Sequence, residues 1–473
     1  MPAKARVCAY TVLRRVFEQG AYAEKALHSA SNDLDSRDRA LAMRLAYGAI
    51  QRKLTLDHTI GQLTERPLQR LDAPVLAALR LGLYELLYLS GAPDRAVVAD
   101  AVELAKLARS PGYGLVNAAL RRAAREGADG LLAGLGEETP ERAAVMHSHP
   151  VWLARMWWEQ LGSERARSLM AADNEPGELA LRVNSLRADP RGVANELGVP
   201  TRTDPELPEA LVVESALDLH RTRAWREGAV VAQSRAAMLV ARVLDPQPGE
   251  RVLDLCAAPG GKSTHIAALM GGEGEVAAVE RNPARAERLR ETARRLGATN
   301  VTVEVADAAL PRAGDETFDR VLVDPPCSGL GTLQARPDLR WRGLADRRSR
   351  RSPIGGDPAD GPGGWASHSG IERGSAPERI RELVALQKEI LTAGARSLRP
   401  GGTLVYSTCT ISAAENEQLL EQFLSKNSDF ILDDLAREWT SHPHPRAQRF
   451  LLTLPDRDRT AGFFIARIRR KPG

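Results

Sequence analysis

Apolar residues recur at helical spacing through the first part of the chain. Three stretches repeat apolar positions three or four residues apart, and polar breaks at 31–33 and 91–93 separate them. Their apolar positions are Val12, Leu13, Val16 and Phe17, then Leu76, Leu79, Leu83 and Leu86, then Val97, Ala101, Leu104 and Ala108. This period is typical of helices with one buried face. We therefore expect an all-α bundle over residues 1–135, which the periodicity alone does not distinguish from a structural cap.

The pattern becomes mixed between residues 140 and 230. A short strand is predicted at 181–186, a helix at 191–197 and a second strand at 211–213. We expect a small α/β module here, with Asn184 in a loop.

From residue 231 to the end, short apolar runs alternate with helical periods. Strands are predicted at 252–255, 276–279, 301–305, 321–323, 403–406 and 463–466, and helices at 284–296 and 383–398. Alternation of this kind predicts a doubly wound, largely parallel sheet, which binds its ligands at the carboxyl ends of the strands.

Residues 349–377 interrupt this pattern. The segment is rich in Gly, Ser, Pro, Asp and Arg and has few aliphatic residues. Because it cannot bury enough apolar surface to fold alone, we expect a disordered insertion. A basic arm that holds RNA is the alternative.

The stretch 251–264 reads as a strand, a tight glycine turn and a helix. Such a turn brings backbone N–H groups close to a ligand. A phosphate-binding P-loop would require glycine where Cys256 stands, and Pro259 removes a donor. A nucleoside cofactor fits better, since the next predicted strand ends at Glu280, an acid suitably placed to hold a ribose.

Two cysteines follow predicted strands of the same sheet. Cys327 lies in VDPPCSG and Cys409 lies in YSTCT. Each alone is more often a small buried apolar residue, but both should converge beside the glycine turn. A thiolate that adds to carbon 6 of a pyrimidine makes carbon 5 nucleophilic, which allows methyl transfer. Asp324 is placed to polarise the base, and the second thiol can assist release.

Composition excludes several other classes of protein. The 473 residues carry a net charge of +4, with no apolar run long enough to span a membrane. The N-terminal residues do not form a secretory signal, and the four cysteines lack CxxC spacing, so we expect no metal site and reduced cytosolic thiols. Seven arginines lie between 336 and 351, and the tail 466–471 is basic. Such runs are either solvated faces or phosphate contacts.

The N-terminal region resembles the NusB domain. The resemblance rests on 9–17, 37–48 and 112–122, the last ending in VNAALRR. It implies contact with RNA or with ribosome-assembly proteins rather than catalysis.

Residues 231–473 resemble the Sun-type (nucleolar protein/Sun) family of RNA cytosine-5 methyltransferases. The matching text is LDLCAAPGGKSTH, DRVLVDPPCSGLGTL, LRPGGTLVYSTCT and AAENE. The resemblance implies a Rossmann-like methyltransferase core that binds S-adenosyl-L-methionine, preceded by an RNA-binding module at 140–230. It also implies methylation of cytosine 967 in 16S rRNA.

The same resemblance assigns roles to individual residues. Cys409 is the implied nucleophile, Cys327 assists release and Asp324 lies between cofactor and cytosine. Glu280 holds the ribose, where the family usually has Asp, and Asp307 lies by the adenine. The rest of the implied cofactor site is Cys256, Ala257, Ala258, Pro259, Gly260, Gly261 and Lys262.

The chain departs from the family pattern at a few positions. Ser234 and Ala461 replace acids, and Ala413-Ala414 replaces Pro-Glu. None of these changes removes a catalytic group. The insertion follows Arg336-Pro337-Asp338, which resembles the family's RNA-side loop.

The leading hypothesis is a monomeric cytoplasmic enzyme that methylates small-subunit rRNA. The alternative is a non-catalytic RNA-binding ribosome-assembly factor on a methyltransferase fold, which the intact cysteine pair disfavours. A nicotinamide dehydrogenase would require a GxGxxG turn, which 258–261 does not supply.

Overall fold

The computed structural model describes residues 2–215, 217–310, 317–342 and 376–473. The chain forms two compact units. The first contains residues 1–176 and 333–342, and the second contains 177–332 and 343–473, so the chain passes between them three times. No helix within the described ranges is long and apolar enough to cross a membrane.

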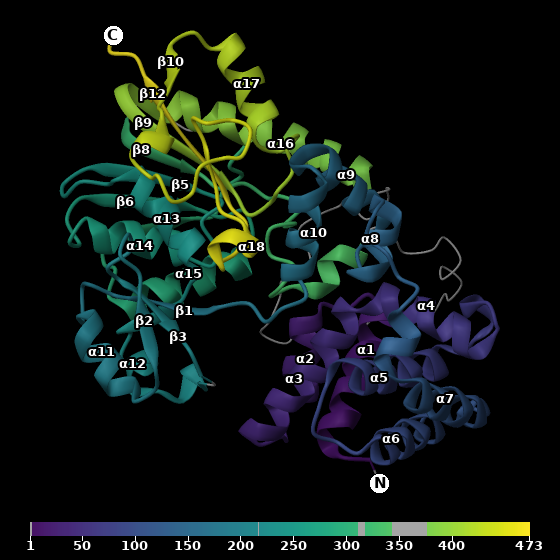
Figure 1. Ribbon diagram of the computed structural model, residues 1–473. Coiled ribbons are helices and arrows are strands. Elements are labelled where there is room, and N and C mark those ends of the chain that lie inside the picture. Colours follow the sequence, from purple (N-terminus) through teal and green to yellow (C-terminus); the bar gives the residue numbers. More distant parts are fainter. Residues whose placement is uncertain (1, 216, 311–316, 343–375) are drawn as a thin grey trace. The chain divides into compact units, whose positions relative to one another are not determined.

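The first unit is helical, as the apolar periodicity predicts (Figure 1). Helices α1, α3, α5 and α7 pack around one apolar core. Asp35 begins α3 by accepting a hydrogen bond from the backbone N–H of Asp38 at 2.8 Å, which satisfies a donor left open at the helix N-terminus. The helices are α1 (Lys4–Gln19), α2 (Ala23–Ala30), α3 (Ser36–Gln51), α4 (Lys53–Thr64), α5 (Ala73–Tyr88), α6 (Asp94–Leu107), α7 (Tyr113–Leu132), α8 (Pro140–Met146), α9 (Val151–Leu161) and α10 (Ser163–Ala172).

A short antiparallel sheet opens the second unit. Its strands are β1 (Leu179–Val183), β2 (Thr201–Thr203), β3 (Ala210–Val213) and β4 (Val230–Ala232), in the order β2-β3-β1-β4. Helices α11 (Pro190–Leu197) and α12 (Arg223–Arg226) accompany it. Asn184 follows β1 and is buried, where it donates to the carbonyls of Gly228 and Leu296. It therefore joins this module to the core.

The core of the second unit is a mixed sheet ordered β10-β12-β9-β8-β5-β6-β7, with β11 paired to β12. Strands β9, β8, β5, β6 and β7 run parallel, whereas β12 and β10 join antiparallel. The strands are β5 (Arg251–Leu255), β6 (Glu275–Val279), β7 (Val301–Glu304), β8 (Phe318–Val323), β9 (Leu398–Thr408), β10 (Phe430–Leu432), β11 (Leu451–Leu452) and β12 (Phe464–Arg470). The predicted Rossmann-like α/β fold is confirmed.

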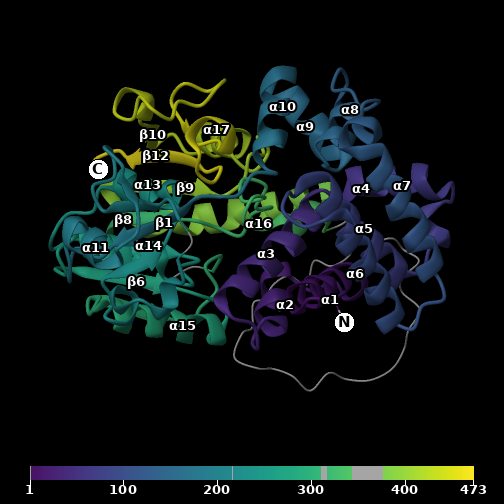
Figure 2. The same ribbon diagram turned by 60° about the horizontal axis from the view of Figure 1, so that its bottom comes forward.

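Helices cover both faces of this sheet (Figures 1 and 2). Gly394 of α16 lies against Leu255, Val321 and Val323, whereas Asp254 faces α14 on the other side. Helix α15 begins after the cap residue Asn282, with Pro283 in its first turn, and ends at Gly297, which has a left-handed conformation. The helices are α13 (Arg235–Leu244), α14 (Gly261–Leu269), α15 (Pro283–Leu296), α16 (Ala376–Ser397), α17 (Glu417–Lys426) and α18 (Pro455–Asp458).

The predicted insertion lies mostly outside the described residues. Residues 349–375 are not described, but Ala376 and Pro377 begin α16. The prediction of disorder was therefore wrong for these last two positions, because proline suits the first turn of a helix.

The arginine-rich segment is not a uniformly solvated face. Residues 333–342 belong to the first unit, and Arg340 is fully buried there. Its guanidinium donates to the carbonyls of Gln51, Ser148 and Asp173 and to the side-chain oxygen of Asn174, at 3.0–3.3 Å. Burial lowers the pKa of Arg340 to about 10. Within the basic tail, Arg467 is likewise buried, in ion pairs with acidic residues.

We predict that Arg340→Ala strongly destabilises the first unit. The change removes four hydrogen bonds and leaves buried acceptors unpaired, at a cost of about 3 kcal/mol or more. Scanning calorimetry should record a lower Tm, whereas Arg336→Ala, at an exposed position of the same segment, should not change it. Equal Tm values for the two variants would contradict the structural role of Arg340.

We also predict that Asp254 makes stability depend on pH. Burial raises the pKa of this carboxyl from 3.8 to about 7, against a hydrogen bond from Ser263. A raised folded pKa gives stability that is fully present below about pH 4 and lost as the pH rises toward 7. Between pH 5 and 7 the wild type should therefore lose on the order of 2 kcal/mol relative to Asp254→Asn.

The measurement is the free energy of unfolding of both proteins from pH 5 to 8. Above pH 7 the two curves should run parallel. The control is Asp218→Asn at an exposed position, which should follow the wild type throughout. Wild-type and Asp254→Asn curves that stay parallel from pH 5 to 7 would refute the prediction.

Candidate active site

Strands β5 and β8 end at the same level of the sheet, and the neighbouring β9 runs two residues further, to Thr408. Leu255 of β5 pairs with Val323 of β8, which pairs with Tyr406 of β9. Because these strands are parallel, Cys256 and Asp324, which directly follow β5 and β8, lie level with Ser407, the next-to-last residue of β9. Cys256, Asp324 and Ser407 are therefore brought close from positions far apart in the sequence.

A charged pair and a hydroxyl join these strand ends. The Lys262 ammonium, in the first turn of α14, lies 2.7 Å from an Asp324 carboxylate oxygen. Ser407 donates its hydroxyl to the other Asp324 oxygen at 3.0 Å. Burial disfavours the charged form of Lys262, but the adjacent Asp324 carboxylate more than compensates and raises the pKa of Lys262. Asp324 is thus fixed in orientation by two donors.

The two predicted cysteines meet beside this pair. The Sγ atoms of Cys327 and Cys409 are 3.3 Å apart, and both residues are partly buried. The hydrogen bond to Cys409, together with burial, raises the pKa of Cys327 well above its ordinary value. Cys327 therefore favours its protonated form, and either sulfur can donate the hydrogen bond that joins them.

Two glycines hold the Cys409 loop in close contact with neighbouring backbone. The N–H of Gly331 donates to the Cys409 carbonyl at 3.0 Å, and the N–H of Gly462 donates to the Gly331 carbonyl at 2.7 Å. A Cβ atom at Gly331 would lie 1.9 Å from the Gly462 carbonyl oxygen. Any side chain at Gly331 would therefore push these segments apart.

The glycine turn forms a narrow cradle before α14. Ala257 and Ala258 are buried, Pro259 is exposed, and the peptide bond between Ala258 and Pro259 is cis. Gly260 has a φ of 101°, a conformation that side chains disfavour, and Gly261 begins α14. Cys256 has a φ of 66°, and burial raises the pKa of its thiol.

The predicted ribose and adenine acids follow β6 and β7. Glu280 is 4% exposed, accepts a hydrogen bond from the Asn282 N–H at 2.8 Å and lies 3.4 Å from the Arg285 guanidinium. Arg285 also donates to the Ala258 carbonyl, which links this acid to the glycine turn. Asp307 is half-buried and lies 3.6 Å from Arg281. A buried carboxylate beside a glycine cradle at a helix N-terminus fits a nucleoside cofactor.

The small sheet supports α14 from outside the core. The hydroxyl of Thr264 accepts a hydrogen bond from Arg182 of β1 at 2.9 Å, and His265 lies 2.8 Å from the Glu209 carboxylate. Burial lowers the pKa of His265 to about 4. The helix that carries Lys262 is therefore held by two polar contacts with the small sheet module.

Several residues of the site were not singled out by sequence reasoning. Ser407 is part of the YSTCT motif, and Glu415 and Asn416 are part of AAENE, so both motifs were visible without a role for these side chains. Gln387 of α16 is buried and donates to the Pro326 carbonyl of a distant loop. The helical period of apolar residues does not distinguish such a glutamine from an exposed one, so the sequence did not predict its role.

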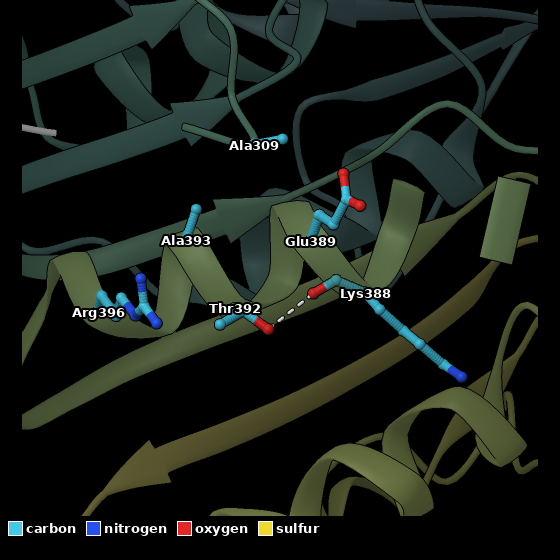
Figure 3. Close-up of a pocket in the computed structure, with 6 residues that line it drawn as sticks. All are labelled: Ala309, Lys388, Glu389, Thr392, Ala393 and Arg396. Carbon is cyan, nitrogen blue, oxygen red and sulfur yellow. Dashed lines mark hydrogen bonds between the residues drawn. The ribbon is translucent and has the colours of Figure 1, made fainter. Parts of the chain in front are cut away.

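A surface depression lies elsewhere on the second unit (Figure 3). Ala309 and one face of α16 line it, through Lys388, Glu389, Thr392, Ala393 and Arg396. None of these is a predicted site residue. Within the described ranges, no group of three His, Cys, Asp or Glu side chains gathers as a metal site would require.

Three family models match successive parts of the chain. The model described as 16S rRNA methyltransferase RsmB/F matches residues 241–347 and 358–469. The NusB family matches 3–125, and a ferredoxin-like domain of RsmF/B-like methyltransferases matches 149–220. The predicted NusB resemblance is confirmed.

Whole proteins match over nearly the full length. A probable ribosomal RNA small subunit methyltransferase B from Synechocystis is 34% identical over 98% of this chain and 99% of its own. Ribosomal RNA small subunit methyltransferase B from Klebsiella pneumoniae is 32% identical, over 98% and 97%. The crystal structure of PH0851 superposes with a TM-score of 0.77 at 26% identity, covering 99% of both chains. The chain belongs to the 16S rRNA methyltransferase RsmB/F family.

Proposed function

We propose that this protein transfers a methyl group from S-adenosyl-L-methionine to carbon 5 of a cytosine in 16S rRNA. The target implied by the family is cytosine 967. The observation that carries the proposal is the 3.3 Å separation of the Cys327 and Cys409 sulfurs, beside the Lys262–Asp324 pair. One thiol can activate a pyrimidine covalently, and a second thiol beside it can assist release.

The cofactor site in this proposal is the cradle from Cys256 to Lys262, with Glu280, Asp307 and Asp324 around it. The buried Glu280 carboxylate would accept hydrogen bonds from ribose hydroxyls, and Asp307 would lie near the adenine. S-adenosyl-L-methionine, when bound, supplies an electrophilic methyl group. The fit rests on the positive φ of Gly260 and the burial of Glu280.

Cys409 begins the reaction as a thiolate that attacks carbon 6 of the cytosine. The new S–C6 bond turns the ring into an enamine whose carbon 5 is nucleophilic. Carbon 5 would then take the methyl group from S-adenosyl-L-methionine, whose S–CH3 bond would break to leave S-adenosylhomocysteine. Asp324, oriented by Lys262 and Ser407, polarises the base near its ring nitrogens. A water molecule takes the carbon 5 proton, the C5–C6 double bond re-forms, and the S–C6 bond breaks to return Cys409 to its thiolate. Cys327 assists this release.

The electrostatics favour Cys409 over Cys327 as the nucleophile. The hydrogen bond to Cys409 raises the pKa of Cys327, which favours the protonated form of Cys327. Burial lowers the pKa of Lys262, but the Asp324 carboxylate and, to a smaller extent, Cys409 raise it. The positive charge of Lys262 therefore attracts a Cys409 thiolate. The negative charge is therefore best held at Cys409.

The remaining domains would hold the RNA. In this proposal the NusB-like region, residues 1–135, and the small module, residues 140–230, supply RNA or ribosome-assembly contacts to the methyltransferase domain, residues 231–473. Phosphate contacts of this kind add affinity without reading sequence.

The function is tested on small ribosomal subunits from cells that lack the protein. Incubation with the wild type and S-adenosyl-L-methionine should create 5-methylcytosine at one 16S position, detected by bisulfite sequencing. Methylation at another base or another atom would overturn the proposal. Binding of the subunit without any methyl transfer would favour the non-catalytic assembly factor.

We predict that Cys409→Ala lowers methyl transfer to the assay background, because the proposed nucleophile is removed. Binding of S-adenosylhomocysteine, measured by calorimetry, should stay within about twofold, since the cradle is unchanged. Normal turnover in this variant would exclude Cys409 as the nucleophile.

We predict that Cys327→Ala accumulates a covalent complex between protein and RNA, because release slows while attack continues. A slow-migrating band on a denaturing gel detects the complex. The double variant Cys327→Ala/Cys409→Ala is the matched control and should give no band. If the single variant turns over normally without a band, Cys327 has no part in release.

A further inference from the structure

Two neighbouring polar residues lie buried behind the cysteine loops. Glu415 and Asn416 immediately precede α17, with exposed fractions of 0% and 2%. Burial raises the pKa of Glu415, partly opposed by hydrogen bonds from Ser328. Among the described residues, the partners of the Glu415 carboxylate are hydrogen-bond donors such as Ser328 and Gln387 rather than a lysine or arginine. Burying a carboxylate without a cation costs free energy of folding, and the hydrogen bonds that the carboxylate accepts offset part of this cost.

The Glu415 carboxylate holds Ser328 directly and Pro326 through Gln387, the two neighbours of Cys327. It accepts from the backbone N–H of Ser328 at 2.8 Å and from the Ser328 hydroxyl at 2.6 Å. Gln387 donates to the same carboxylate at 3.0 Å and to the Pro326 carbonyl at 2.9 Å. Because Pro326 and Ser328 flank Cys327, these contacts fix the backbone that carries its thiol.

Asn416 does the same for the other cysteine. Its side-chain oxygen accepts from the Thr408 hydroxyl at 2.6 Å, and its side-chain nitrogen donates to the Thr410 carbonyl at 3.0 Å. Thr408 and Thr410 flank Cys409. The hydroxyls of Thr410 and Ser328 are 2.7 Å apart, which joins the two loops directly.

We propose that Glu415 and Asn416 form a clamp that sets the positions of both catalytic thiols. Glu415 positions Cys327 and Asn416 positions Cys409, so adjacent residues of one chain segment fix the distance between the two sulfurs. Neither residue touches the substrate in this account, and both are positioning residues. The consequence for turnover rests on the proposed function, whereas the clamp itself does not.

The clamp predicts different defects for its two halves. A displacement of about 1 Å can cost about 100-fold in rate when reacting groups must be aligned. Loosening Cys327 leaves attack intact and slows release, so Glu415→Ala should accumulate the covalent RNA complex as Cys327→Ala does. Loosening Cys409 slows attack, so Asn416→Ala should lower turnover without accumulating the complex. The exposed Glu421→Ala on α17 is the control and should match the wild type.

Two further variants separate position from charge. Glu415→Gln keeps the length of the side chain and an acceptor for the Ser328 N–H, so kcat should stay within a few fold of wild type. Glu415→Asp keeps the charge but is one methylene shorter, so it should resemble Glu415→Ala, with kcat about 100-fold lower. Normal kcat for Glu415→Asp, with a large loss of kcat for Glu415→Gln, would overturn the clamp. This comparison holds even when Glu415→Ala does not fold.

A second readout does not depend on RNA chemistry. Diamide oxidises two neighbouring thiols to a disulfide and takes up their two hydrogens, so the rate of Cys327–Cys409 disulfide formation reports their approach. Peptide mapping should record wild-type rates for Glu415→Gln and Glu421→Ala, and rates about tenfold lower for Glu415→Asp and Asn416→Ala. Equal rates in all variants would overturn the clamp. Slowed disulfide formation, without any adduct in Cys327→Ala, would uphold the clamp and reject the proposed release role of Cys327.

Discussion

The shared level of three parallel strands is the constraint on which the site depends. Strands β5, β8 and β9 are hydrogen-bonded in one register, so their carboxyl ends lie at one edge. The charged pair of Lys262 and Asp324 and the contact of the two sulfurs follow from that register. Pairing shifted by one residue would displace one strand end from the next by about 3.3 Å and separate the groups that follow them. The strand register that stabilises the sheet is therefore also the one that assembles the site.

Around this edge, buried polar groups position Asp324 and the loops that carry the two cysteines. Ser407 orients Asp324, and the Gly331–Gly462 contact supports the Cys409 loop. Glu415 and Asn416 connect the loops behind the cysteines. Such networks lower stability if any member is left without its partner, but a complete network fixes one arrangement. Buried Asp254 lies next to this edge, and its raised pKa means that ionising it near neutral pH lowers the free energy of unfolding.

Much of this arrangement was predictable from the sequence. The helical periods of the first 135 residues and the strand–helix alternation after residue 231 correctly gave the fold class, because burial of one face imposes those periods. The motifs around Cys327 and Cys409 predicted that these residues meet, since each follows a strand of one parallel sheet. Roles for the individual side chains stay proposals.

Other features depend on tertiary contacts that no local pattern carries. Arg340 reads as part of a solvated basic run, yet four oxygens from distant segments surround it. The contacts of Gln387 and Glu415 with the cysteine loops join residues with no shared period. Local periodicity reports which face is buried but does not reveal which buried polar groups find each other.

The most direct test of the central claim identifies the sulfur bound to the RNA. A 16S rRNA substrate with 5-fluorocytosine at the target position cannot lose a proton from carbon 5, so the covalent complex should persist. Tandem mass spectrometry after protease and nuclease digestion should find the modified nucleotide on the peptide that contains Cys409. A nucleotide attached to Cys327, or methylated product without any covalent intermediate, would contradict the account.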